Sequence, residues 1–163
     1  MIQVKADRQP FSEASYALND VSILNRDTAS MISIRASVNG EYLTTYQADG
    51  LIVSTPTGST AYSLSNGGPV VVPGTGVFIM TAVAPHSLNI RPVVIPDSAV
   101  VTLDVESRNH SFLVGIDGRS EKCGEGTRIT LRRAPYNIQV VKRSDTRYFS
   151  TLREKLMWGA DVR

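Results

Sequence analysis

Residues 31–47 have the sequence MISIRASVNGEYLTTYQ, and this stretch decides the fold class. Apolar and polar side chains alternate along residues 31–38 and again along residues 41–47, which is the period of a β-strand with one buried face. Asn39-Gly40 stands between them, and this dipeptide favours the positive backbone angles of a type I′ turn. The stretch therefore predicts a β-hairpin.

Short strands of the same kind are expected on both sides of this hairpin. They are bounded by glycine, proline and other turn residues, and Asp117-Gly118 marks one further turn. The expected strands cover residues 51–54, 69–73, 77–83, 92–95, 100–106, 112–116, 128–133 and 137–143. So many short strands with turn chemistry between them predict a mainly β fold, a β-sandwich of stacked sheets.

Two segments depart from this alternation. Residues 59–66 are expected to form a short helix directly after the TPTGSTAY turn, with Ser59 or Thr60 as its cap. Residues 146–158 predict a longer, carboxy-terminal helix. Its apolar side chains at helical spacing are Phe149, Leu152 and Leu156. We interpret this stripe as core packing, and contact with another domain is the alternative.

The composition is that of an ordinary folded domain. Of 163 residues, 42% are hydrophobic and 20% charged, which is enough apolar material for one core without disulfides or metals. The single cysteine, Cys123, cannot form an internal disulfide and is interpreted as an incidental thiol in a loop. A lone cysteine of this kind fits a cytoplasmic location. No apolar run approaches the roughly 20 residues of a membrane span, so we expect no membrane contact.

Basic residues gather toward the carboxy-terminal end of the sequence. Arg128, Thr130 and Arg132 alternate there with Ile129 and Leu131, which is typical of the solvated face of a strand. A phosphate-rich ligand, a partner chain or nucleic acid is the alternative explanation of this charge. The lack of an aromatic and basic face makes nucleic acid unlikely.

The most unusual segment is residues 49–62, DGLIVSTPTGSTAY. It predicts a strand, a tight hydroxyl-rich turn and a helix start, a geometry that aims N–H groups and hydroxyls at one point and attracts phosphate. Gly58 would let a ligand approach the backbone, and the ring of Tyr62 could stack on a base. It is neither a P-loop nor a nucleophile elbow. From the residues alone, a well-capped turn without a ligand remains open.

Three other positions are candidates with a structural alternative beside each. Asn19-Asp20 precedes an apolar run, and an asparagine amide can read adenine, although a cap or turn pair has the same pattern. His86 follows an apolar strand, where side chains line sites or simply complete local structure. His110 lies in a polar turn and is expected to be exposed.

Residues 49–65 followed by Gly67-Gly68-Pro69 closely resemble the signature of NAD kinases. Residues 17–21, ALNDV, resemble that family's Asn-Glu/Asp motif, and residues 84–88, APHSL, resemble its next recurring segment. The resemblance implies the carboxy-terminal β-sandwich domain of the family. The family's amino-terminal α/β domain carries a Gly-Gly-Asp-Gly motif, whose aspartate acts on the 2′-hydroxyl of the adenosine ribose. This sequence contains no Gly-Gly-Asp.

The resemblance implies a set of NAD contacts and no catalytic residue in this chain, since the general base lies in the absent domain. Asp20 stands where glutamate is commoner. The implied NAD-binding residues are Asn19, Asp20, Asp49, Thr57, Thr60, Ala61, Tyr62, Ser65, Ala84, His86 and Arg119. We accordingly expect an irregular lead-in from the missing domain over residues 1–18, the NAD-binding β-sandwich over residues 19–145 and a helical tail over residues 146–163.

The implied function is the NAD-binding portion of an NAD kinase, which phosphorylates the adenosine-ribose 2′-hydroxyl of NAD to make NADP. The donor is ATP or polyphosphate with a divalent metal such as Mg²⁺, none of it held by this chain alone. The chain alone is expected to be inactive, and the full enzyme is expected to be a homodimer or homotetramer. A non-catalytic dinucleotide-binding module is the alternative.

Overall fold

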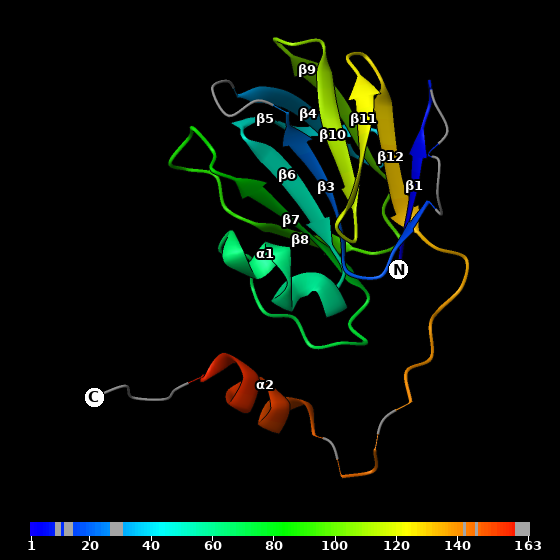
Figure 1. Ribbon diagram of the computed structural model, residues 1–163, viewed down its shortest axis with the longest axis vertical. Helices are drawn as coiled ribbons and strands as arrows, with labels where there is room; N and C mark the ends of the chain where they lie inside the picture. Colours follow the sequence, from blue (N-terminus) through cyan, green and yellow to red (C-terminus); the bar gives the residue numbers. More distant parts are fainter. Residues whose placement is uncertain (9–10, 12–14, 27–30, 142, 146, 159–163) are drawn as a thin grey trace.

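The computed structural model describes residues 1–8, 11, 15–26, 31–141, 143–145 and 147–158. Two antiparallel sheets of six strands each face one another, which confirms the predicted mainly β sandwich (Figure 1). The first sheet has the order β2 (Tyr16–Ala17), β1 (Ile2–Ala6), β12 (Arg128–Arg133), β9 (Val101–Ser107), β4 (Ile32–Val38) and β5 (Glu41–Ala48). The second has the order β11 (Arg119–Gly124), β10 (Ser111–Ile116), β3 (Asp20–Asn25), β6 (Gly50–Ser54), β7 (Val77–Val83) and β8 (Val93–Pro96).

The hairpin that decides the fold class is present as β4 and β5. Asn39 and Gly40 have φ angles of 52° and 81°, as a type I′ turn requires. Val38 pairs with Glu41 at the turn, and a β-bulge shifts the register after Ala36. The turn prediction is confirmed.

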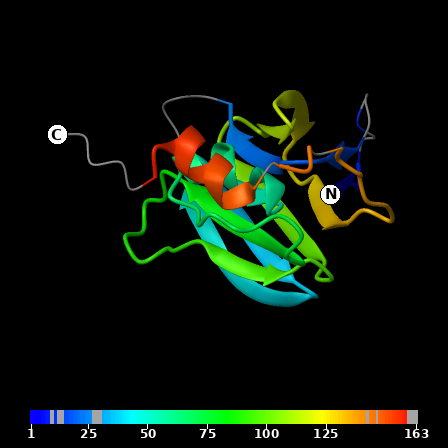
Figure 2. The ribbon, with the colours of Figure 1, turned by 90° about the horizontal axis from the view of Figure 1, so that it is seen from below.

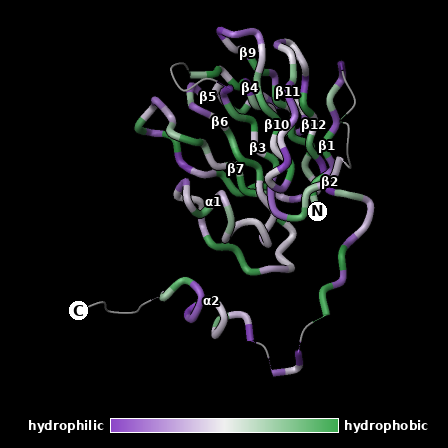
Figure 3. The backbone as a smooth tube through the Cα atoms, in the orientation of Figure 1, coloured by the Kyte–Doolittle hydropathy of each residue, from purple (hydrophilic) through white to green (hydrophobic). Residues whose placement is uncertain are grey.

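The core lies between the two sheets because apolar side chains alternate inward along both. Its largest fully buried side chains include Tyr46, Phe78 and Phe112. Apolar colouring runs along the strands, whereas polar colouring is concentrated in the turns at the upper end of the sandwich (Figure 3). Burying such inward faces contributes roughly 25 cal/mol per Å² of apolar surface.

A third layer covers the outer face of the second sheet. Ile52 and Ile79 lie on the side of their strands away from the core, yet both are fully buried. The helical segment η1 (Thr57–Thr60) and α1 (Tyr62–Ser65) follows β6 directly and contacts it on this side (Figure 2). Apolar side chains are therefore buried on both faces of the second sheet. The turn after β6 packs on its outer face.

The expected irregular lead-in over residues 1–18 is wrong for its described part. Ile2–Ala6 is β1, and it pairs with β12 from Ile2↔Arg133 to Ala6↔Ile129. Ile2 and Val4 alternate with Gln3 and Lys5, so the period-two signal was present but only five residues long. Residues 9–10 and 12–14 lie outside the described residues.

Two expected strands are absent from the structure. Residues 69–73 and 137–141 are extended loops without ladder partners, and Val140 and Val141 are exposed, so an apolar side chain alone did not make a strand there. Residue 142 is not described. Cys123 lies in β11, which the sequence did not predict, rather than in a loop. Its thiol is buried, and burial together with Glu121 raises its pKa to about 11.

The tail helix forms as α2 (Tyr148–Leu156), but its apolar stripe does not join the core. No residue of α2 is buried, and Phe149 is 59% exposed. Tyr148, Phe149 and Leu152 face the loop at Val70 and Val72, outside the sandwich. The expected core packing is wrong because α2 lies outside the sandwich, beyond the ends of the sheets (Figure 1). Residues 146 and 159–163 of the expected tail lie outside the described residues.

Among the described residues, a helix with the length and apolar character to cross a membrane is not found.

Candidate functional site

Three segments that are distant in sequence meet at one end of the second sheet. They are the loop before β3 with the first residue of that strand (residues 18–20), the turn after β6 (residues 55–58) and the β10–β11 turn (residues 117–118). The Thr55 amide donates to the Asn19 carbonyl at 2.8 Å, and the Asp117 amide donates to the Asp20 carbonyl at 3.1 Å. Pairing of β3 with both β6 and β10 creates this junction, because all three segments extend from neighbouring strands.

The turn after β6 is fastened to the loop before β3 by Thr55. Its Oγ1 donates to the Leu18 carbonyl at 2.7 Å and accepts from the Gly58 amide at 3.1 Å. Gly58 is buried against Asn19, and a Cβ on Gly58 would overlap the Asn19 backbone. A glycine is therefore required at position 58 by protein packing, whereas the sequence suggested room for a ligand.

Buried hydroxyl groups bond the helical segment to the chain around it. Ser59 Oγ donates to the Pro56 carbonyl at 2.7 Å and accepts from the Val71 amide at 3.0 Å. Ser63 Oγ lies 3.0 Å from Thr81 Oγ1 on β7. The expected Ser59 or Thr60 cap is wrong, since Pro56 and Ala61 precede η1 and α1 and neither helix has a side-chain cap.

The opposite side of this segment presents polar groups outward. The exposed candidate side chains there are Thr57, Thr60, Tyr62 and Ser65, and Ala61 is half-buried among them. Tyr62 is 40% exposed although its ring is large and apolar. Such an arrangement suits an aromatic base stacking on the ring with hydroxyls beside it.

Asp20 is the most perturbed carboxyl group at the junction. It is only 7% exposed, and burial followed by the nearby charge of Asp117 raises its pKa to about 6. Its strand partner is Ser54, whose buried Oγ makes no hydrogen bond within the described residues. A buried carboxyl beside a buried hydroxyl that lacks a partner is a local cost that a bound polar ligand could offset.

Arg119 begins β11 immediately after the Asp117-Gly118 turn, and it is exposed at the same end of the sheet. His110 lies at the other end of that hairpin, where it contacts Glu125 and is 83% exposed. The expected exposure of His110 is confirmed.

The remaining candidates form a second group at the opposite end of β6. The Asp49 amide donates to the Val83 carbonyl at 3.0 Å, which places Asp49 beside Ala84, and the His86 amide donates to the Gln47 carbonyl at 2.9 Å. Asp49, Ala84 and His86 are all exposed, and Ala84 has the left-handed φ of 44°. The strand between Asp49 and Thr55 is extended and spans roughly 20 Å. Asp49 therefore lies at the other end of β6 from the turn at Thr55.

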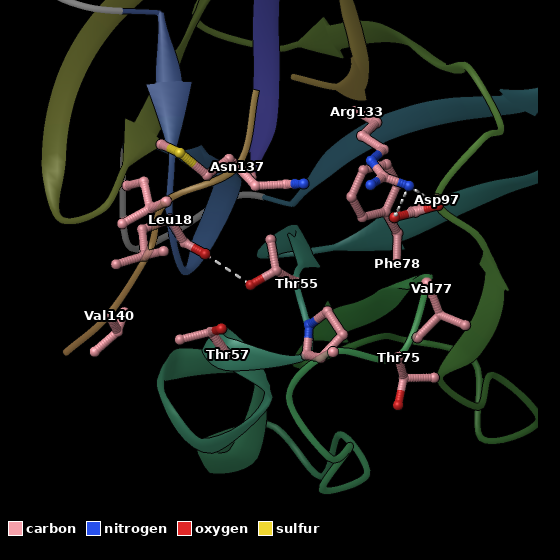
Figure 4. Close-up of a pocket in the computed structure, with 15 residues that line it drawn as sticks. Leu18, Thr55, Thr57, Thr75, Val77, Phe78, Asp97, Arg133, Asn137 and Val140 are labelled. Carbon is pink, nitrogen blue, oxygen red and sulfur yellow. Dashed lines mark hydrogen bonds and ion pairs between the residues drawn. The ribbon is translucent and has the colours of Figure 1, made fainter. Parts of the chain in front are cut away.

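A cavity of about 370 Å³ opens beside the turn after β6 (Figure 4). Leu18, Thr55 and Thr57 line one side of it. Arg133 and Asp97 line the other side and form an ion pair at 3.2 Å. In the part of the chain that the structure describes, no group of three or more His, Cys, Asp and Glu side chains could hold a metal ion.

Sequence reasoning treated two residues at this junction as parts of turns only. Thr55 belongs to the quoted motif but was given no role, and Asp117 was assigned a turn. Asp117 contacts residues 97 to 99 positions away in the chain. No local pattern carries that information, because it depends on which strands pair.

Known proteins are similar in sequence to this chain. Residues 18–143 match the family model described as the ATP-NAD kinase C-terminal domain. An NAD kinase of Bacteroides fragilis is 60% identical over 163 residues, which cover 100% of this chain and 56% of that protein. An NAD kinase of Porphyromonas gingivalis is 49% identical over 152 residues, covering 93% of this chain and 53% of that protein. The chain spans about half the length of the curated relatives it matches.

Two solved structures have the same architecture. An NAD kinase from Archaeoglobus fulgidus in complex with ATP has a TM-score of 0.71 at 30% identity, over 83% of this chain and 51% of that one. The yeast NADH kinase complexed with NADH has a TM-score of 0.87 over 99% of this chain and 50% of that one. At 24% identity the second likeness shows the fold alone.

Proposed function

This chain belongs to the ATP-NAD kinase family, of which it carries the C-terminal domain, and we propose that it is the NAD-binding portion of an NAD kinase. The whole enzyme would transfer a terminal phosphoryl group from ATP or polyphosphate to the adenosine-ribose 2′-hydroxyl of NAD, giving NADP. Transfer of this kind depends on positioning and on charge stabilisation. Holding the acceptor nucleoside is the part of that task that falls to this chain.

The observation that carries the proposal is the junction of the loop at Asn19 with the turn at Thr55. The backbone of Asn19 is bonded to the turn there, and the exposed hydroxyls and the Tyr62 ring follow in the helical segment that continues this turn. Asparagine can donate to and accept from adenine, and an aromatic ring offers a stacking face. Asn19, Asp20, Thr57, Thr60, Ala61, Tyr62, Ser65 and Arg119 are proposed as the NAD contacts of this group.

The second group, Asp49, Ala84 and His86, supports a homo-oligomer as part of the same proposal. It is exposed and lies at the other end of β6 from the turn at Thr55, with roughly 20 Å of extended strand between Asp49 and Thr55. In this proposal, the second group contacts an NAD molecule held by the first group of a neighbouring copy. A two-fold dimer would build two such sites at once, since the same surfaces then meet twice.

In this proposal, the chain itself binds neither the phosphate donor nor the metal that accompanies it. A solved NAD kinase at 30% identity is in complex with ATP, which supports a nucleotide as the donor for the whole enzyme. The described residues offer no cluster of metal-binding side chains, so no step is assigned to a metal bound by them. A cytoplasmic location is proposed with this function, because NAD and ATP are metabolites of that compartment.

Calorimetric titration of the chain with NAD tests the proposal. Asn19→Ala and Tyr62→Ala are compared with Tyr42→Ala, which removes a similarly exposed tyrosine from the first sheet. We expect saturable NAD binding that the first two substitutions weaken by about tenfold or more and the control leaves unchanged. Absence of binding by a folded sample, with no NADP formed on adding a Gly-Gly-Asp-Gly half, would exclude it. NAD binding without NADP formation in that mixture would favour a non-catalytic module.

A further inference from the structure

The Asp117 carboxylate accepts hydrogen bonds from the segment that carries Asn19 and Asp20. Asp117 Oδ2 accepts a hydrogen bond from the Leu18 amide at 2.6 Å. Asp117 Oδ1 accepts from the Asn19 amide at 2.8 Å and from the Asp20 amide at 3.1 Å. Three consecutive N–H groups thus point at one ionised group, and hydrogen bonds to a charged acceptor are the stronger kind.

The backbone at Asn19 is therefore held from two directions. Its amide donates to Asp117, and its carbonyl accepts from the Thr55 amide at 2.8 Å. The Asn19 side chain is half-buried beside this fixed backbone. A fixed backbone is the support that a ligand-reading asparagine needs.

The turn itself does not require a carboxylate at position 117. Asp117 and Gly118 have φ angles of 48° and 83°, nearly those of the Asn39-Gly40 turn in the same chain. Asparagine would make the same type I′ turn without adding negative charge beside buried Asp20. The Asp117 carboxylate is repelled by the nearby carboxyl group of Asp20. Its three hydrogen bonds to the loop offset this repulsion.

We propose that Asp117 is a positioning residue of the dinucleotide site, which fixes the Asn19-Asp20 backbone so that the Asn19 side chain meets the ligand. This inference rests on the proposed function. Asp117 acts through the loop and touches no ligand in this account. Its replacement should therefore change how well NAD is held, and leave the phosphoryl-transfer chemistry of bound NAD unchanged.

The test compares Asp117→Asn and Asp117→Ala with Asp7→Asn. Asp7 is a matched control because its carboxylate also accepts from a distant amide, that of Arg128 at 2.9 Å, but on the first sheet. We measure the Kd for NAD and the hydrogen exchange of the amides at residues 18–20. With a Gly-Gly-Asp-Gly half supplied, kcat and KM for NAD are measured as well.

We expect Asp117→Asn to raise the Kd and KM for NAD by about tenfold and to leave kcat within about twofold, as for lost ground-state binding. Exchange at residues 18–20 should accelerate, and Asp117→Ala, which loses every acceptor, should be more severe. The control should change none of these. Wild-type affinity or wild-type exchange at residues 18–20 in Asp117→Asn would overturn the inference. Failure of the unmodified chain to bind NAD would instead remove the proposed function on which it rests.

Discussion

Gly58 lies so close to Asn19 that the two backbones leave no room for a side chain at position 58. The contact joins the turn after β6 to the loop before β3, where the Thr55 amide also donates to the Asn19 carbonyl. The two motifs that the sequence analysis singled out separately are thus one rigid unit. A change at Gly58 acts on Asn19 directly.

Gly58→Ala should therefore damage both stability and the candidate site. The added methyl group has to displace the Asn19 backbone, and overpacking of this kind costs about 1–3 kcal/mol. Gly124→Ala is the matched control, since a Cβ on Gly124 meets nothing within 4 Å. Urea denaturation and NAD titration of both variants check the prediction. Equal behaviour of the two variants would mean that the loop moves aside freely.

Asp20→Asn should stabilise the chain at neutral pH. The carboxyl has a pKa of about 6 in the folded protein against an ordinary 3.8, so folding favours its protonated form. That contribution is fully present below pH 3.8 and is lost as the pH rises through about 6. At pH 7 the amide should therefore be more stable by up to about 3 kcal/mol, with little difference at pH 3.5.

Urea denaturation of the two proteins from pH 3.5 to pH 8 measures this difference. Only the difference between them matters, because the other carboxyl groups titrate alike in both. A constant difference across that range would contradict the raised pKa of Asp20.

Substitutions at the neighbouring residues Ser59 and Thr60 should have different effects, the first on the stability of the chain and the second on NAD binding. Ser59 is fully buried and bonded to Pro56 and Val71, so Ser59→Ala leaves buried groups without partners and should cost about 1–3 kcal/mol. Thr60 is exposed, and its hydroxyl makes only a 3.4 Å contact with the Thr57 carbonyl. Thr60→Ala should weaken NAD binding and change stability by less than about 0.5 kcal/mol. Thermal unfolding and NAD titration of each variant distinguish the two roles.

The strands could be predicted from sequence wherever alternation ran for more than about five residues between clear turns. β4, β5, β9 and β12 were found in this way. β1 was missed because its alternation is short, and β11 because its residues are mostly polar on both faces. Residues 137–141 have apolar side chains but no strand beside them to complete a ladder.

The residues of the candidate site could be predicted from the sequence, but their arrangement in space could not. The motif and its resemblance named Asn19 and Tyr62, but alternation does not say which strands pair. The separation of Asp49 from Thr57 and the clamp at Asp117 both follow from strand pairing between β3, β6 and β10. The role of Gly58 was misjudged for the same reason, since its neighbour in space is 39 residues away in sequence.

Removal of residues 147–163 should leave the sandwich intact. No described residue of α2 is buried, so the loss should change the free energy of unfolding by less than about 0.5 kcal/mol. Phe112→Ala in the core should instead cost about 3–5 kcal/mol. Urea denaturation compares the two. A large loss on removing the tail would mean that α2 contributes to the core stability of the chain.

Mixing two defective variants should restore NAD binding if a site is shared between copies. Asp49→Ala damages the second group of candidates and Tyr62→Ala the first, so each variant alone should bind poorly. When they are unfolded together and refolded, random pairing in a two-fold dimer gives about half mixed dimers, each with one intact site of two. About a quarter of the sites should then bind NAD with wild-type affinity, which calorimetric stoichiometry measures. Asn19→Ala mixed with Tyr62→Ala is the control, because both residues belong to one group and no mixed dimer contains an intact site. Recovery with the first pair and not with the second would locate the site between copies, whereas no recovery with either pair would mean that each chain holds its NAD alone.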